Sequence, residues 1–97
     1  MIKNALAEVE IKNHPVANAL FKSEGCKVLV IAFKKGMILK EHKANITSKL
    51  IVLNGKVNYV NDEMRTALGQ YDEFEIPINQ LHSVEAVEDS LCLLIQG

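Results

Sequence analysis

Short apolar strands at regular spacing constrain this chain more than any other feature. From residue 27 onward, runs of Val, Ile, Leu, Phe and Tyr alternate with Gly, Asn, Asp and Pro. The first group favours strands and the second favours turns. Strands repeating every eight to twelve residues or so predict an all-β antiparallel sandwich or barrel. We expect strands over residues 27–33, 37–43, 49–53, 56–60, 64–68, 71–76, 81–87 and 90–96.

Two local sequence features predict an N-terminal helix and a tight turn. Met1–Glu10 has the composition of a helix that would end before Pro15, although "VEI" at residues 9–11 reads equally well as a strand. Asn54–Gly55 lies between two apolar runs, and this pair is the strongest short-range indication of a β-hairpin. We therefore predict one N-terminal helix and a hairpin that turns at Gly55.

Size and composition indicate a single domain over residues 1–97 in an intracellular setting. The chain has 97 residues, a net charge of −1 and no basic stripe, so we expect no nucleic-acid partner. It has no run of eighteen apolar residues, and its N-terminus has no apolar block, so we expect no membrane insertion and a cytoplasmic location. Cys26 and Cys92 are far apart in sequence and not in a CxxC pair, which predicts two free thiols.

Two histidines stand out when the strands are divided into faces. Side chains alternate along a strand, so His42 is expected to share a face with Ile38 and Lys40. His82 shares a face with Val84 and Ala86 in the same way. Both histidines are therefore predicted to lie on mostly apolar faces.

The segments that carry these histidines resemble the two motifs of the cupin superfamily. The first motif reads G-x5-H-x-H-x3-4-E-x6-G, and residues 36–55 match it at Gly36, His42 and Gly55. The second reads G-x5-P-x-G-x2-H-x3-N, and residues 71–86 match it at the proline and histidine, with Asn79 in a glycine place. The resemblance implies a cupin-like jelly-roll barrel, also called a double-stranded β-helix. The matched and departing positions of the second motif are Tyr71, Pro77, Asn79, His82 and Ala86.

The resemblance implies a metal site that is reduced in this chain. Cupins hold a metal with three residues of the first motif and one of the second, and only His42 and His82 carry over. Ala44 and Ser48 stand where the motif has its second His and its Glu. Two imidazoles and water can hold a divalent transition metal (Zn, Ni, Fe, Cu or Mn), which we would expect at low occupancy. Alternatively, the histidines are neutral core residues bonded to each other, to Ser48 or to water.

Three functions stay open at this point. His42, Ser48 and His82 can be the polar groups of a small-molecule pocket with apolar walls, which is how such pockets are usually built. A metal-dependent cupin enzyme of the isomerase or dioxygenase type would use a two-histidine site. A non-catalytic protein, functional as a dimer, would need neither.

Strands that are apolar on both faces predict a homodimer. Residues 27–33, 49–53 and 91–95 carry large apolar side chains at successive positions. A single barrel interior buries only one face of each strand. The N-terminal segment is too short to cover three strands, so we expect a second copy to cover the remaining apolar surface.

Overall fold

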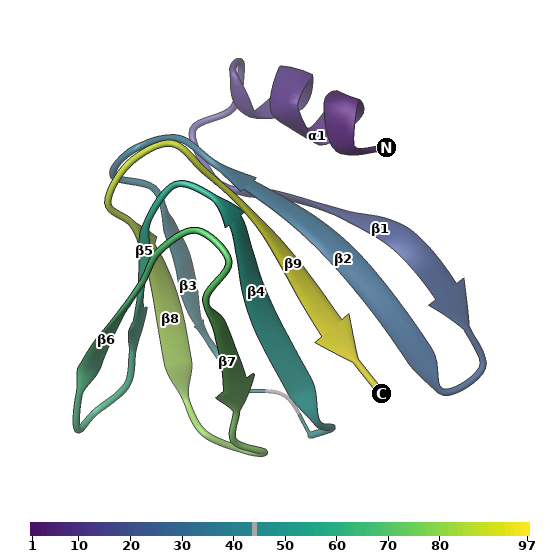
Figure 1. Ribbon diagram of the computed structural model, residues 1–97, viewed down its shortest axis with the longest axis vertical. Helices are drawn as coiled ribbons and strands as arrows, with labels where there is room; N and C mark the ends of the chain where they lie inside the picture. The colour runs from purple at the N-terminus through teal and green to yellow at the C-terminus, as the bar shows by residue number, and fades with distance from the viewer. Residues whose placement is uncertain (44) are drawn as a thin grey trace.

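The computed structural model describes residues 1–43 and 45–97, with the side chains of all of these except Glu41 and His42. Within this part of the chain there are one helix and nine strands, and the strands form two antiparallel sheets that face each other (Figure 1). The first sheet has the strand order β1-β2-β9-β4-β7 and the second has the order β3-β8-β5-β6. The elements are α1 (Ile2–Val9), β1 (Val16–Ser23), β2 (Cys26–Phe33), β3 (Ile38–His42), β4 (Ser48–Asn54), β5 (Val57–Val60), β6 (Arg65–Leu68), β7 (Glu73–Ile76), β8 (His82–Ala86) and β9 (Ser90–Gln96).

Most of the predicted elements are confirmed. Eight of the strands coincide with predicted runs to within two residues at each end, and α1 ends at Val9, so the strand reading of "VEI" is wrong. Strand β1 was not predicted, because "VANALFKS" contains Ala and Asn, which do not favour strands. It forms by pairing with β2, after a turn through Gly25, and a β-bulge interrupts the pairing between Ala19 and Phe21.

The hairpin predicted at Asn54–Gly55 is wrong. Strand β4 pairs with β7 and β9 in the first sheet, whereas β5 pairs with β6 and β8 in the second. The turn therefore carries the chain from one sheet to the other. Gly55 has φ = +91° and passes directly against the backbone of Asp89 and Ser90, in the β8–β9 connection. The Ser90 hydroxyl accepts a hydrogen bond from the Lys56 N–H at 3.0 Å and thereby joins the two turns.

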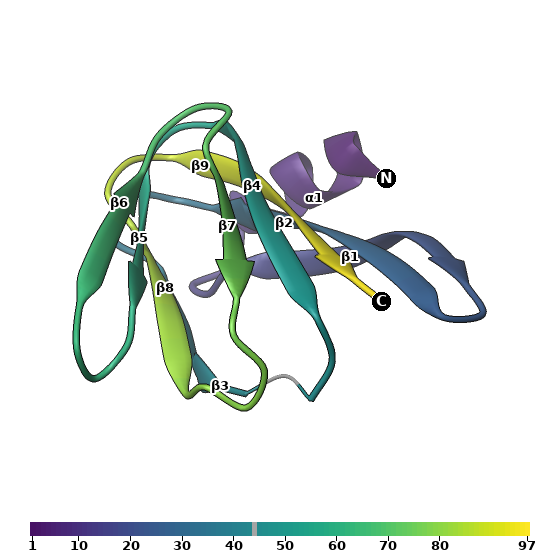
Figure 2. The same ribbon diagram turned by 60° about the horizontal axis from the view of Figure 1, so that its bottom comes forward.

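The core lies between the two sheets (Figure 2). Inward-facing residues of both sheets meet there, and the largest completely buried ones are Tyr59, Phe33, Ile31 and Leu50. The predicted apolar face of β8 is confirmed, because Val84 and Ala86 are buried. On β4, Leu50 and Val52 are buried in the same core. This region between the sheets is the barrel interior, and His82 is buried in it.

The helix α1 covers part of the opposite face of the first sheet. Ala5 and Val9 pack against the outward-facing Val16, Val30 and Ala32, and these five residues form a second, smaller core cluster. Figures 1 and 2 show α1 on the side of the sheet that faces away from β3, β8, β5 and β6. The chain therefore covers one end of this outer face itself.

Ion pairs join the end of α1 to the loops beside it. The Lys34 Nζ lies 2.7 Å from a Glu10 carboxylate oxygen and 3.0 Å from one of Asp89. The backbone N–H of Lys35 donates to Asp89 at 2.8 Å. This N–H and the Lys34 ammonium hold the pKa of Asp89 below its ordinary value. The carboxylates raise the pKa of Lys34, Glu10 more than Asp89.

This arrangement predicts a stability difference that depends on pH. Because folding lowers the pKa of Asp89, its carboxylate stabilises the fold above pH ~4 and the contribution disappears as the pH falls through the folded pKa. Asp89→Asn should therefore lower the urea midpoint slightly at neutral pH and leave it unchanged at about pH 2. Asp62→Asn, in the exposed β5–β6 turn, is the matched control. An equal loss for Asp89→Asn at both pH values would contradict this reading.

Both cysteines are free, as predicted. Cys92 is buried on β9, and burial raises the pKa of its thiol to about 12, so it is inert at neutral pH. Cys26 begins β2 and is partly exposed. Among the described residues, no helix is both long and apolar enough to cross a bilayer.

Candidate functional site

His82 is the centre of the polar site inside the barrel. It begins β8, is only 1% exposed, and its Nδ1 lies 2.9 Å from the backbone carbonyl oxygen of Gln80. A carbonyl oxygen can only accept, so Nδ1 carries a proton and donates it to this oxygen. The tight turn before β8 thus fixes both the orientation and the tautomer of the imidazole.

Tyr59 forms the wall on which this imidazole lies. The rings of Tyr59 and His82 stack, with centroids 5.0 Å apart and an interplanar angle of 23°. The ring of Phe74, on β7, contacts Tyr59 as well, with the two ring centroids 4.3 Å apart. The Tyr59 side chain comes from β5, in the second sheet, and is completely buried. Burial raises the pKa of the Tyr59 phenol, which is therefore a neutral hydrogen-bond donor.

Gln80 connects Tyr59 with the loop that positions His82. The Tyr59 hydroxyl donates to the Gln80 Oε1 at 2.7 Å, and the Asn61 Nδ2 donates to the same oxygen at 3.1 Å. Gln80 therefore orients His82 through its backbone and Tyr59 through its side chain. Gln80 and Asn61 also line a polar hollow of about 360 Å³, together with Lys43, Asp62, Glu63, Asn79 and Leu81.

Nothing in the sequence pattern indicated Tyr59, Asn61 or Gln80 as residues of the site. Tyr59 has the alternation of an ordinary core residue in "KVNYV", and nothing in the local pattern relates it to a histidine 23 positions later. Gln80 lies inside the second motif, two residues before His82, where the motif specifies no residue type. The turn itself was recognisable in the sequence, because Asn79 stands in a glycine place of the motif. The structure agrees, since Asn79 has φ = +60°.

The backbone of β3 places position 42 opposite His82. The strand is irregular, however, so the predicted strict alternation of its faces does not hold. Ile38, expected on the histidine face, is 48% exposed, whereas Leu39 packs against the core. Leu39 pairs with Val84 and His42 pairs with His82, so three steps along β3 match two along β8. The extra residue is a β-bulge, which returns position 42 to the face that Leu39 occupies. The approach of the two imidazoles stays a prediction, because the His42 side chain lies outside the described part.

Ser48 faces inward at the start of β4, as predicted, and is 1% exposed. Its hydroxyl donates to the Ile46 carbonyl and accepts from the Gln96 Nε2, both at 3.3 Å. Its position across from Gln96 on β9 thus gives it partners away from the Gln80 turn. Ala44, where the first motif has its second histidine, lies outside the described residues. The role of Ser48 in ligand binding stays a prediction.

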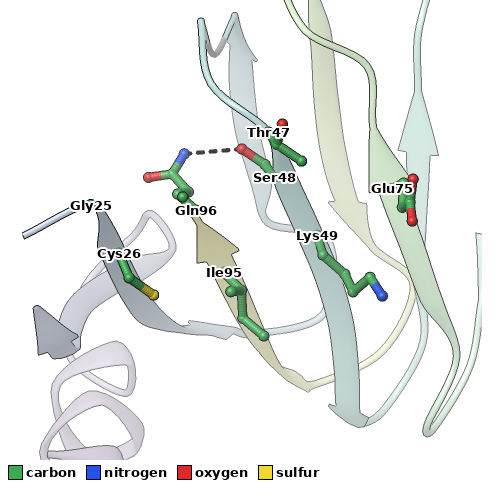
Figure 3. A pocket seen from close by; sticks show the side chains of 9 residues that line it. Gly25, Cys26, Thr47, Ser48, Lys49, Glu75, Ile95 and Gln96 are labelled. Atoms are coloured by element: carbon green, nitrogen blue, oxygen red, sulfur yellow. Dashed lines mark hydrogen bonds between the residues drawn. The ribbon is translucent and has the colours of Figure 1, made fainter. Parts of the chain in front are cut away.

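A larger hollow lies beside Ser48, at the edge of the first sheet. It measures about 420 Å³ and is lined by residues of the β1–β2 turn, β4, β7 and β9. Figure 3 shows Cys26 on one side, Ile95 in the middle, and Lys49 and Glu75 on the other side, with the Gln96–Ser48 hydrogen bond at one end. Neither His82 nor Tyr59 lines it, so this hollow is distinct from the site around His82.

The described residues alone do not make a complete metal centre. Among them, no group of three or more His, Cys, Asp or Glu side chains lies close enough together to hold an ion. The hydrogen bond from the His82 Nδ1 to a backbone carbonyl is nevertheless the arrangement that metal-ligating histidines use. His82 therefore fits a ligand role, and its only predicted partner is His42.

Solved structures with the same architecture are numerous. The chain is similar to an RmlC-like cupin protein from Desulfovibrio desulfuricans, with 28% sequence identity and a TM-score of 0.80, over 87% of this chain and 82% of that one. A protein with a double-stranded β-helix domain from Klebsiella pneumoniae is 16% identical, with a TM-score of 0.84 over 100% of this chain and 86% of that one. KdgF from Halomonas sp. is 17% identical, with a TM-score of 0.78 over 89% and 82% of the two chains.

The structural likeness confirms the predicted jelly-roll fold, the double-stranded β-helix. No family model and no curated protein matches the chain. Function must therefore be argued from the residues of this chain.

Proposed function

Because the chain is a small protein of the cupin superfamily, we propose that it binds a small molecule inside the barrel, against the wall formed by Tyr59 and His82. The observation that carries this proposal is the fixed orientation of His82, whose ring is held by the Gln80 carbonyl and stacks on Tyr59 beside the apolar core cluster. A few oriented polar groups among aromatic and aliphatic side chains are typical of small-molecule pockets. His42, across the strand pair, would supply a second polar group.

The chemistry of the wall favours an uncharged or weakly polar ligand. Tyr59, Phe74, Leu50 and Ile76 belong to, or pack against, the interior cluster, and none of them carries a charge. Burying an ion there without a partner would cost several kcal/mol. We therefore expect a ligand that has an apolar or aromatic body and one uncharged polar group directed at His82.

The proposal is tested by what the barrel retains on purification. The protein should be prepared without an affinity tag and denatured, and the released molecules should be identified by mass spectrometry. We expect one organic compound from the wild type and from His14→Gln, an exposed control, but not from His82→Gln. Retention of the same compound by His82→Gln would contradict the proposal. If the wild type releases no compound, neutral fragments are added and the NMR signals of Tyr59 and His82 are followed. No shift of these signals with any fragment would also contradict the proposal.

A metal-dependent enzyme is the second candidate, supported by the Nδ1–carbonyl hydrogen bond of His82 and by its register with His42. These two residues would hold the metal, and a bound metal would act as a Lewis acid. The same preparations decide between the candidates by elemental analysis. Our proposal expects well under one metal per chain. About one metal per chain, lost in His82→Gln, would favour the enzyme.

A further inference from the structure

The interior site around His82 is closed to solvent. Tyr59 and His82, whose rings form its wall, are 0% and 1% exposed. Thr66 pairs with Tyr59 across β5 and β6, so its side chain points to the same side of the sheet. The Thr66 Oγ1 is buried and has no hydrogen-bond partner among the described residues, although buried hydroxyl groups normally have one. A molecule that entered could bond to it, but would first have to displace part of the protein.

The polar hollow of about 360 Å³ lies next to this wall, at one end of the barrel. Its lining comes from the β5–β6 turn, the turn before β8, and Lys43 beyond β3. Figure 2 shows the ends of β3, β5, β7 and β8 that adjoin these segments at the same end of the molecule. Gln80 lines the hollow and is also hydrogen-bonded to both Tyr59 and His82, so it lies between the hollow and the site.

The side chain of Gln80 is held separately from its backbone. Its Oε1 accepts hydrogen bonds from the Tyr59 hydroxyl at 2.7 Å and from the Asn61 Nδ2 at 3.1 Å. Both donors are uncharged, and the net stability of such bonds is small because water can replace each partner. The Gln80 carbonyl holds the His82 Nδ1, and the Gln80 N–H donates to the Pro77 carbonyl at 3.4 Å. Rotation of the side chain therefore uncovers Tyr59 and leaves His82 in place.

We propose that the Gln80 side chain is the gate of the interior site. When it rotates away from Tyr59, a molecule passes from the polar hollow to the wall formed by Tyr59 and His82. This inference rests on the proposed function, because a gate serves a site that takes up a molecule. Entry between the strands would cost more, since β8 and β6 pair with β5 on either side of Tyr59 and their separation would break sheet hydrogen bonds.

The accessibility of Tyr59 to a small neutral quencher tests the gate without a known ligand. The chain has two tyrosines and no tryptophan, so Tyr71→Phe leaves Tyr59 as its only tyrosine fluorophore. Fluorescence lifetimes give the bimolecular quenching constant for acrylamide, which does not depend on brightness. We expect a low constant in this background and a rise of about tenfold or more when Gln80→Ala removes both hydrogen bonds. Gln70→Ala, in the exposed β6–β7 turn, is the matched control and should leave the constant unchanged.

Asn61→Asp is a second variant that loosens the gate without truncating it. It removes the Nδ2 donor to Gln80 but keeps the oxygen that accepts from the backbone N–H groups of Glu63 and Met64, both at 2.9 Å. The loss of one hydrogen bond should raise the quenching constant about fivefold. Urea unfolding followed by circular dichroism checks that each variant is folded, and Asn61→Asp decides alone if Gln80→Ala does not fold.

An unchanged quenching constant in the folded gate variants would overturn the proposal, whether or not the barrel retains a compound. Fast quenching of Tyr59 with Gln80 in place would overturn it too, and so would an equal rise in Gln70→Ala. A rise restricted to the Gln80 and Asn61 variants would support the gate. It would do so even if no compound or fragment bound to the wild type, a result that counts against the proposed function alone.

Discussion

Gly55→Ala should destabilise the protein far more than Gly36→Ala. Both glycines have φ near +90°, so alanine at either position costs about 1–2 kcal/mol in backbone strain. At Gly55 a Cβ would also overlap the carbonyl oxygen of Asp89 and lie 2.7 Å from the Ser90 Cα, whereas at Gly36 it would meet nothing within 4 Å. We expect a total loss of about 3–5 kcal/mol for Gly55→Ala.

Urea unfolding monitored by circular dichroism measures both glycine variants under one set of conditions. The difference between them isolates the steric contact between the two turns, because the backbone strain is common to both. Equal losses would show that the β4–β5 turn moves away from the β8–β9 turn at little cost. That result would contradict the close approach of Gly55 to Ser90.

Tyr59→Ala should lower the free energy of unfolding by about 3–5 kcal/mol, a large part of what a domain of this size possesses. The reason is that Tyr59 is completely buried and its ring contacts both His82 and Phe74. Tyr59→Phe removes only the hydroxyl that donates to Gln80 and should cost about 1 kcal/mol. Thermal and urea unfolding give both values.

Tyr71→Phe is the control for the hydroxyl deletion, because Tyr71 is 74% exposed. We expect it to change stability by less than about 0.5 kcal/mol. A second readout is the tautomer of His82, which nitrogen-15 NMR of the imidazole reports. Tyr59→Phe should retain the proton on Nδ1, since the Gln80 carbonyl remains. A wild-type His82 protonated on Nε2 alone would contradict the proposed orientation of the site.

The parts of the fold that the sequence predicted are those that local composition determines. The β-branched and apolar runs define β2, β4 and β9, and inward burial of Leu50 and Val84 follows from alternation. Strand β1 was not predicted because its stability comes from pairing with β2 rather than from its own composition. The Gly55 turn was assigned to a hairpin because turn chemistry specifies a reversal of the chain but not which sheet receives the next strand.

The site was predictable to a smaller extent. The two motifs identified His82 and Ser48 as inward-facing, and the structure shows both to be buried. The bulge in β3 could not be anticipated, because it inserts one residue without a Gly or Pro to mark it. Tyr59 and Gln80 meet across the space between β5 and the turn before β8. No pattern along the sequence encodes a contact of that kind.

The central place of β9 in the first sheet has a consequence for the order of folding. This strand follows the other eight described strands in sequence, yet it lies between β2 and β4 and bonds to both. During synthesis, the β1–β2 hairpin and strand β4 emerge from the ribosome long before the strand that joins them. Until β9 is made, the edges of β2 and β4 that it will pair with have no partner, and unpaired strand edges promote aggregation of growing chains. A topology with such distant contacts also folds slowly, so we expect the closure of the sheet by β9 to be a late step in folding.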